Sequence, residues 1–438
     1  MSAQVNARQA ALETLIRCRR DGSWSGAAID AGIKKYGLDR RDAALASKLC
    51  LGVLQNTALC DFYIDHYCTS KVEPAVRDIL RLGVYQLLFL DRIPARAAVN
   101  ETAALCRTKG LTRVVGLVNA VLRRISEEKD HLPEIPGEGT AAFLSVKYSH
   151  PLWLCQYMAE RKGYPFAEGF LKANNEAAPL CLQVNTIKID TADYVLALER
   201  EQIPCRVLTP EGCIELDGGL ASALPGYEEG LFYVQDRAAR LAAEIAAPES
   251  GMRVLDACAC PGGKSFAAAI RMKDTGSILS CDIHEKKLRV LEKSAARLGL
   301  GCIGTRAMDA RVFDPVFENA FDLVIADVPC SGLGVIAKKP EIREKDPASL
   351  RDLPRIQSAI LENLSRYVKP GGTLLYATCT VLSEENEDVI RAFLDRHGNY
   401  RAEDFSLCGI QSADGMYTFW PNIDGTDGFF AAKLRRID

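Results

Sequence analysis

Hydrophobic positions in residues 1–130 recur every three or four residues, which is the period of one face of an α-helix. One such stretch runs from Val76 to Leu88 and another from Val114 to Leu122. A third covers Arg40–Gln55, where the carboxylate of Asp39 can cap the helix. Few stretches alternate apolar and polar residues with period two. The pattern therefore predicts an all-α bundle over residues 1–130.

After the bundle the pattern changes twice. Proline and glycine concentrate in residues 131–142, which is typical of a linker. Residues 143–249 begin with helical spacing at Phe143–Gly163, and a helix is also expected at Ala192–Glu201. Short strands are expected at Leu180–Val184, Cys205–Leu208 and Leu231–Val234. This mixture predicts a small α+β subdomain.

Residues 250–438 alternate between apolar strand-like runs and helical stretches. The expected strands are Arg253–Ala257, Ser277–Asp282, Gly304–Met308, Phe321–Asp327 and Gly372–Thr378. The expected helices are Lys264–Met272, His284–Leu298, Pro354–Val368 and Glu384–Arg396. Such alternation implies a parallel sheet covered on both faces, with ligands at the carboxyl ends of its strands. A hairpin of Met416–Trp420 and Gly428–Leu434 is expected to add antiparallel strands at one edge.

Charge and cysteine content indicate which partners and which cellular location suit the protein. Of the 54 Lys and Arg and 57 Asp and Glu residues, residues 1–130 hold 20 and 14, which leaves 34 and 43 for the rest of the chain. The basic amino-terminal part suits an RNA partner, although such an excess is also found on ordinary solvated surfaces. The 16 cysteines form no Cys-x-x-Cys pair and only 5 histidines accompany them, so no metal site is expected. With no signal peptide and no apolar run long enough for a membrane span, we expect reduced thiols and a cytoplasmic location.

Candidate chemistry begins at Val254–Ser265, which reads Val-Leu-Asp-Ala-Cys-Ala-Cys-Pro-Gly-Gly-Lys-Ser. A strand, a glycine turn and a helix amino terminus together suit a polar or anionic ligand group. Asp282 ends the next strand, where it can accept hydrogen bonds from both hydroxyls of a ribose. Cys258 stands where a P-loop needs its first glycine, and the dinucleotide fingerprint Gly-x-Gly-x-x-Gly is absent. An adenosine ligand without a pyrophosphate, best matched by S-adenosylmethionine, is the hypothesis; an ordinary strand-to-helix turn is the alternative for this loop alone.

Two cysteines follow the ends of strands expected at the same edge of the sheet. Cys330 closes Asp327-Val-Pro-Cys, and Cys379 closes Ala377-Thr-Cys. Methylation of a pyrimidine at carbon 5 is chemistry that uses two thiols: one adds to carbon 6, and the other assists its later elimination. Asp327 and Lys264 could stabilise the charge that develops at N3 and O2 of the ring. A single cysteine in either position would more often be structural.

These motifs resemble the RNA 5-methylcytosine methyltransferases. The resemblance lies in the glycine loop, Asp327–Gly332, Ala377–Thr380 and the closing Asp427–Leu434. Ala98–Leu105 and Gly116–Arg124 resemble the NusB-like RNA-binding bundle, so the chain is similar to bacterial enzymes that methylate a cytosine of 16S ribosomal RNA. The resemblance implies an all-α NusB-like bundle, a small α+β subdomain and an α/β Rossmann-like class I methyltransferase domain. The implied partner is 16S ribosomal RNA or an assembly intermediate.

The resemblance also implies roles for individual residues. Cys379 is the nucleophile and Cys330 assists product release. The cofactor is held by Cys258, Ala259, Cys260, Pro261, Gly262, Gly263 and Lys264, by Asp282 at the ribose, by Asp309 near the adenine and by Asp327 beside the methyl-transfer site. Cys260 departs from the family, which usually has alanine there, and Val335–Lys345 lacks the usual tryptophan.

Lys338, Lys339 and Arg343 are candidates for RNA phosphate contacts because they follow Cys330 on a basic loop. A solvated loop is an equally good interpretation of any one of them.

Three other hypotheses about function stay open. The same chemistry could act on transfer RNA or another RNA, or the chain could be an RNA-binding or antitermination factor without activity. As in the DNA cytosine methyltransferases, Cys330 could also be the attacking thiol.

Overall fold

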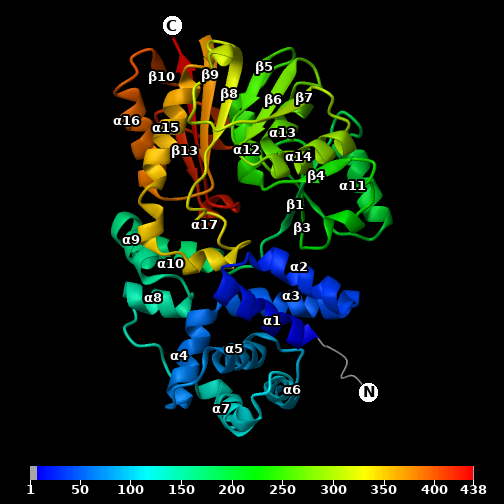
Figure 1. The fold of residues 1–438 in the computed structure, drawn as a ribbon, viewed down its shortest axis with the longest axis vertical. Helices are drawn as coiled ribbons and strands as arrows, with labels where there is room; N and C mark the ends of the chain where they lie inside the picture. Colours follow the sequence, from blue (N-terminus) through cyan, green and yellow to red (C-terminus); the bar gives the residue numbers. More distant parts are fainter. Residues whose placement is uncertain (1–6, 438) are drawn as a thin grey trace. The chain divides into compact units, whose positions relative to one another are not determined.

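The computed structural model describes residues 7–437, which fall into two compact units (Figure 1). The first unit extends to Glu176 and also includes Ile336–Lys345, and the second consists of Ala177–Val335 and the chain from Asp346 onward. The chain therefore leaves the second unit after Val335 and returns to it at Asp346. This grouping divides the predicted α+β segment, because its first helices belong with the bundle and its strands with the second unit.

The first unit is helical, as predicted. Its helices are α1 (Ala7–Asp21), α2 (Ser25–Tyr36), α3 (Arg40–Gln55), α4 (Thr57–Tyr67), α5 (Pro74–Phe89), α6 (Ala95–Thr108), α7 (Val115–Glu127), α8 (Ala141–Lys147), α9 (Leu152–Lys162) and α10 (Tyr164–Ala173). Helix α5 packs against α1, α3, α4, α6 and α7, and its buried Ile79, Leu80 and Val84 lie in the shared core. The Asp39 carboxylate caps α3 by accepting a hydrogen bond from the Asp42 N–H at 2.8 Å, which confirms the predicted start of that helix.

The single helix predicted over Phe143–Gly163 is wrong. The structure has two helices there, α8 and α9, separated by a turn in which Ser149 takes a left-handed backbone conformation (φ 53). Pro151 is the N-cap of α9 and cannot continue the hydrogen-bonding of a preceding helix, so the chain restarts at Leu152. Helix α10, which follows Gly163, was not predicted.

A four-stranded antiparallel sheet opens the second unit. Its order is β2-β3-β1-β4, with β1 (Leu180–Val184), β2 (Arg206–Leu208), β3 (Cys213–Leu216) and β4 (Phe232–Val234). Helix α11 (Thr191–Arg200) packs on it through buried Tyr194 and Leu198. Strand β3 was not predicted, because four residues that follow a Glu-Gly pair give too short a pattern for its alternation to be recognised.

The larger sheet has the order β10-β14-β9-β8-β5-β6-β7, with β13 paired to β14. Its strands are β5 (Arg253–Asp256), β6 (Ser277–Asp282), β7 (Ile303–Ala307), β8 (Phe321–Asp327), β9 (Val368–Thr378), β10 (Tyr400–Ala402), β13 (Met416–Phe419) and β14 (Phe429–Arg436). The pairs from β9 through β8, β5 and β6 to β7 are parallel, whereas β14 is antiparallel to β9, β13 and β10. The predicted parallel sheet and its closing antiparallel hairpin are confirmed.

Helices cover both faces of this sheet and enclose separate cores. One core includes residues of α12 (Arg237–Ala246), α13 (Gly263–Arg271) and α14 (Glu285–Leu298). The other includes residues of α15 (Leu353–Ser365) and α16 (Glu387–Leu394). Burial on both faces explains why the central strands read as continuous apolar runs such as Leu323–Ala326.

The described residues include every cysteine of the chain. All 16 cysteines lie among residues 7–437, none of them forms a disulfide bond, and half of them are buried. No single helix between residues 7 and 437 is long and apolar enough to cross a membrane; α3 and α4 would meet that criterion together, but they are bent by 77° relative to each other. In the same part of the chain, no group of three or more His, Cys, Asp or Glu side chains is arranged to hold a metal ion.

Candidate active site

The glycine loop connects β5 to α13 at the carboxyl edge of the parallel sheet. Its backbone is held by the Ala257 and Ala259 N–H groups, which donate to the carbonyls of Ile325 and Cys281 at 3.0 and 2.7 Å. Gly262 is the N-cap of α13 and has φ 114, a conformation that favours glycine. A Cβ atom there would also lie 2.4 Å from the Phe266 ring. The turn therefore requires glycine, and it leaves the amino terminus of α13 at the edge where a polar ligand is expected.

Beneath this loop lies a buried acid that the sequence pattern alone did not single out. Asp256 is fully buried and accepts a hydrogen bond from the Ser265 hydroxyl at 2.7 Å, and that hydroxyl also lies 2.7 Å from the Ser280 hydroxyl. Burial raises the pKa of the Asp256 carboxyl to about 7. The signal was present in the sequence, because a carboxylate at the end of the apolar run Val254–Leu255 must find a buried hydrogen-bond partner.

Two further acids follow the neighbouring strands, as predicted. Asp282 ends β6, is 9% exposed and accepts a hydrogen bond from the His284 N–H at 2.8 Å. Asp309 follows β7, and its carboxylate accepts from the backbone N–H and the guanidinium of Arg311 at 2.7–3.0 Å. These hydrogen bonds lower the pKa of Asp309. Hydrogen bonds fix both carboxylates in position, and carboxylate oxygens are acceptors suited to hydroxyl and amine groups.

Lys264 and Asp327 form an ion pair between α13 and the end of β8. The Lys264 Nζ lies 2.6 Å from Asp327 Oδ2 and 4.8 Å from the centroid of the Phe429 ring. The lysine side chain is 7% exposed and that of the aspartate 30%, so only the acid is open to solvent. The pair places a cation and a carboxylate side by side, where they can donate to and accept from one polar ring.

The predicted cysteines meet at the same edge. Strands β8 and β9 are adjacent and parallel with Asp327 opposite Ala377, so the residues that follow them emerge together. The Cys330 and Cys379 sulfur atoms lie 3.2 Å apart, and both residues are partly exposed. The hydrogen bond to Cys379, together with burial, raises the pKa of the Cys330 thiol well above its usual value. A proton can therefore be held on Cys330 while the sulfur of Cys379 accepts from it.

The basic loop that follows Cys330 belongs to the first unit. Lys338 is partly exposed, and Lys339 is exposed with its ammonium 5.3 Å from the centroid of the Trp24 ring. Arg343 is only 6% exposed. Its guanidinium donates to the backbone carbonyls of Gln55, Tyr148, Ser149 and Asn174 and to the Asn175 side-chain oxygen. Arg343 is thus occupied in holding helix ends together, and the expectation that it contacts phosphate does not fit; only Lys338 and Lys339 stay predictions.

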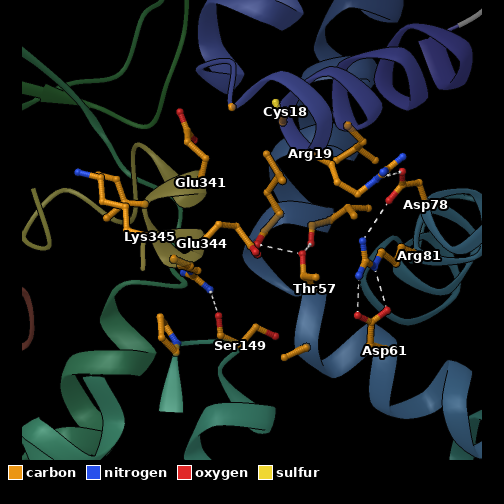
Figure 2. A pocket seen from close by; sticks show the side chains of 18 of the residues that line it. Cys18, Arg19, Thr57, Asp61, Asp78, Arg81, Ser149, Glu341, Glu344 and Lys345 are labelled. Carbon is orange, nitrogen blue, oxygen red and sulfur yellow. Dashed lines mark hydrogen bonds and ion pairs between the residues drawn. The ribbon is translucent and has the colours of Figure 1, made fainter. Parts of the chain in front are cut away.

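A cavity of about 760 Å³ lies within the first unit beside this loop (Figure 2). Four of its labelled charged residues pair with one another: Asp78 accepts from Arg19 and from Arg81, both at 3.0 Å, and Arg81 also pairs with Asp61 at 2.6 Å. These charges neutralise each other within the wall of the cavity, so they do not form an anion site. Sequence reasoning missed this cavity, because its residues come from segments far apart in the chain.

Comparison with known proteins assigns each part of the chain to a family. Residues 243–435 match the family described as 16S rRNA methyltransferase RsmB/F, residues 5–127 match the NusB family, and residues 150–221 match the ferredoxin-like domain of RsmF/B-like methyltransferases. The solved structure of PH0851 superposes with a TM-score of 0.83 at 25% identity, over 99% of this chain and all of that one. The structure of NSun6 from Pyrococcus horikoshii with SFG shares the fold, with a TM-score of 0.58 at 20% identity over 65% of this chain and 98% of that one.

Curated relatives match the whole chain. The probable ribosomal RNA small subunit methyltransferase B of Bacillus subtilis is 34% identical over 99% of both chains. Its counterpart in Synechocystis sp. is 33% identical over 99% of this chain and all of the relative. The second unit thus has the Rossmann-like fold of class I methyltransferases, the glycine turn and acids at its edge suit a nucleoside ligand, and the cofactor is S-adenosylmethionine. The chain belongs to the family of ribosomal RNA small subunit methyltransferase B.

Proposed function

We propose that the chain methylates carbon 5 of a specific cytosine in 16S ribosomal RNA, through a covalent bond between Cys379 and the base. The observation that carries the proposal is the pair of thiols 3.2 Å apart, on the sheet edge that also bears the Lys264–Asp327 ion pair. The names of the full-length relatives support a small-subunit ribosomal RNA substrate. We infer that the enzyme acts in the cytoplasm, on free RNA or on an assembly intermediate.

The proposed chemistry divides the work among four side chains. The cofactor, when bound, supplies an electrophilic methyl group on its sulfonium. The Cys379 thiolate adds to carbon 6 of cytosine, which makes carbon 5 nucleophilic. Lys264, held by its ion pair with Asp327, donates a hydrogen bond to the charge that spreads to O2 and N3. After transfer Cys330 passes its proton to the Cys379 sulfur as the bond from carbon 6 breaks, and the Cys330 thiolate so formed takes up the proton from carbon 5 as the ring double bond re-forms.

The cofactor contacts are proposed from the edge of the sheet. The loop Cys258–Lys264, made of Cys258, Ala259, Cys260, Pro261, Gly262, Gly263 and Lys264, would hold it from one side. Asp282 would accept from the ribose hydroxyls, Asp309 would accept from the adenine amine beside Arg311, and Asp327 would lie next to the transferred group. Lys338 and Lys339 are proposed as contacts to RNA phosphates.

The three hypotheses that the sequence leaves open would use these residues differently. Methylation of transfer RNA would use the same residues on a different substrate. If Cys330 attacks carbon 6, as in the DNA enzymes, the roles of the two thiols are exchanged, and the 3.2 Å separation allows either order. An RNA-binding or antitermination factor without activity would not need the two thiols so close together.

The test is methyl transfer from labelled S-adenosylmethionine to 16S ribosomal RNA that lacks the modification. Mass spectrometry of the digested RNA should place the label on carbon 5 of one cytosine. Label on an adenine or guanine would contradict the chemistry. Label on transfer RNA alone would make transfer RNA the substrate. Absence of cofactor binding would favour the RNA-binding factor without activity.

A further inference from the structure

The peptide groups on both sides of Cys330 are held by two buried side chains. The Gln357 Nε2 donates to the Pro329 carbonyl at 3.0 Å and to Glu385 Oε2 at 2.7 Å. The same Glu385 oxygen accepts from the Ser331 N–H at 2.9 Å. Gln357 is fully buried and Glu385 is 1% exposed, so these bonds do not compete with water. Together the two side chains fix the backbone immediately before and immediately after Cys330.

The residue next to Glu385 holds Cys379 in the same way. Asn386 Oδ1 accepts from the Thr378 hydroxyl at 2.6 Å, and Asn386 Nδ2 donates to the Thr380 carbonyl at 3.1 Å. One amide thus bridges the residues before and after Cys379. Asn386 is 1% exposed, and it is the N-cap of α16, so its backbone is fixed by the start of that helix.

Two further bonds join these supports. The hydroxyls of Ser331 and Thr380, which follow the two cysteines, lie 2.6 Å apart. The Tyr376 hydroxyl donates to the Glu385 carbonyl at 2.6 Å, which ties the chain before Asn386 to strand β9. Because Glu385 and Asn386 are consecutive, one short segment determines the position of both cysteine backbones. Such an arrangement controls the sulfur–sulfur separation more tightly than the two strand ends could alone.

We propose that Glu385 and Asn386, together with Gln357, are positioning residues that hold Cys330 and Cys379 at the separation their chemistry needs. Glu385 and Gln357 serve Cys330, and Asn386 serves Cys379. The inference rests on the proposed function for its kinetic consequences, but the geometric claim concerns only the two thiols. A displacement of about 1 Å is enough to slow a step that depends on aligned reacting groups.

The geometric claim is tested without RNA or cofactor, by the rate at which diamide converts the two thiols into a disulfide. Diamide takes up the two hydrogen atoms that the thiols lose, and peptide mass spectrometry identifies the Cys330–Cys379 product. Glu385→Ala and Gln357→Met should slow this reaction by about tenfold or more, whereas Glu385→Gln, which keeps an acceptor oxygen, should stay near the wild-type rate. Glu384→Gln alters the exposed neighbouring acid and should also react like the wild type.

Kinetics on RNA distinguish the hydrogen bonds that position Cys330 from those that position Cys379. Glu385→Ala should behave like Cys330→Ala: the Cys379–RNA adduct forms but is released about tenfold more slowly, with little change in the KM for RNA. Asn386→Ala should instead slow formation of the adduct, like a partial loss of Cys379. Thermal unfolding and cofactor binding of each variant show whether it is folded. If Glu385→Ala does not fold, Gln357→Met tests the same hydrogen bonds with a side chain of similar length.

The outcomes are distinct. Wild-type cross-linking rates in folded Glu385→Ala and Gln357→Met would overturn the positioning role, as would equal slowing in Glu384→Gln. Slower cross-linking in these variants, combined with no methyl transfer by the wild-type protein, would keep the positioning role and remove the proposed function. Restoration by Glu385→Gln of both cross-linking and product release would establish that the hydrogen bonds, and not the charge, set the separation.

Discussion

Two neighbouring stretches of the chain, residues 327–332 and residues 336–345, use polar side chains in opposite ways. In the first, Asp327 and Cys330 are partly exposed at the edge of the sheet, where their partners are other reactive groups. In the second, Arg343 is buried and all five of its described acceptors belong to helix ends and loops of the first unit. Residue type alone therefore does not reveal whether a charge serves chemistry or structure; burial and the number of partners decide it.

The largest effect is expected at the first stretch and its partner strand. Cys379→Ala should lower methyl transfer by roughly 10⁴-fold or more, because the variant lacks the thiol that is proposed to bond to carbon 6. Cofactor affinity should barely change. Cys330→Ala should instead accumulate a protein–RNA adduct that resists denaturant and is visible as a shift on a gel. The reverse pattern, an adduct only in Cys379→Ala, would make Cys330 the nucleophile.

At the second stretch, Arg343→Met should cost stability. Removal of the guanidinium leaves buried carbonyl groups without donors, and such losses amount to about 3–5 kcal/mol of unfolding free energy. Urea unfolding of the variant measures this loss, and Lys339→Met on the same loop is the matched control. Should Arg343→Met unfold like the control but bind RNA more weakly, Arg343 would have to be counted among the RNA contacts after all.

The comparison also extends to Asp256, a buried acid of the second unit. Its pKa is raised to about 7 from 3.8, so the folded state binds a proton more tightly than the unfolded state does. The stabilisation is complete below the unfolded pKa and is lost as the pH rises toward 7. Between about pH 5 and about pH 8, the wild type should lose about 3 kcal/mol more unfolding free energy than Asp256→Asn. Parallel pH profiles for the two proteins would show that Asp256 does not titrate in this range.

A smaller effect is expected for cofactor binding. Asp282→Ala should remove hydrogen bonds to the ribose and weaken S-adenosylmethionine binding by on the order of 1.5–3 kcal/mol. Calorimetry on the folded variant measures the change. Glu285→Ala, an exposed acid at the start of α14, provides a control of equal charge. Unchanged affinity in Asp282→Ala would exclude the ribose contact.

The sequence allowed the sheet and its reactive edge to be predicted because both depend on short-range patterns. The strand ends at Asp282, Asp327 and Thr378 can be located from apolar runs, and parallel strands bring the residues after their carboxyl ends to one edge. The supports behind the cysteines could not be predicted, because Gln357 reaches Pro329 and Glu385 only through packing of α15 on the sheet. Long-range polar contacts of this kind leave no periodic signal.

The same limit explains the error at Arg343. A run of Lys338, Lys339 and Arg343 has the composition of a phosphate-binding loop, and nothing local distinguishes its members. The carbonyls that surround Arg343 come from Gln55, from residues 148 and 149 and from Asn174, each at the end of a helix whose last carbonyls need donors. Helix ends could be predicted from sequence, but not which cation would satisfy them.

Lys339 provides the smallest and most specific test of the comparison. It is exposed, it lies four residues before Arg343, and its ammonium is near Trp24, so it is available to a phosphate as Arg343 is not. Lys339→Ala should leave unfolding free energy within about 0.5 kcal/mol of the wild type, because surface charges contribute little. It should weaken RNA binding modestly and reduce the slope of log K against log salt by about one. Titrations of 16S ribosomal RNA at several salt concentrations measure that slope. An unchanged slope would mean that Lys339 does not contact phosphate, and it would leave Lys338 as the remaining candidate on this loop.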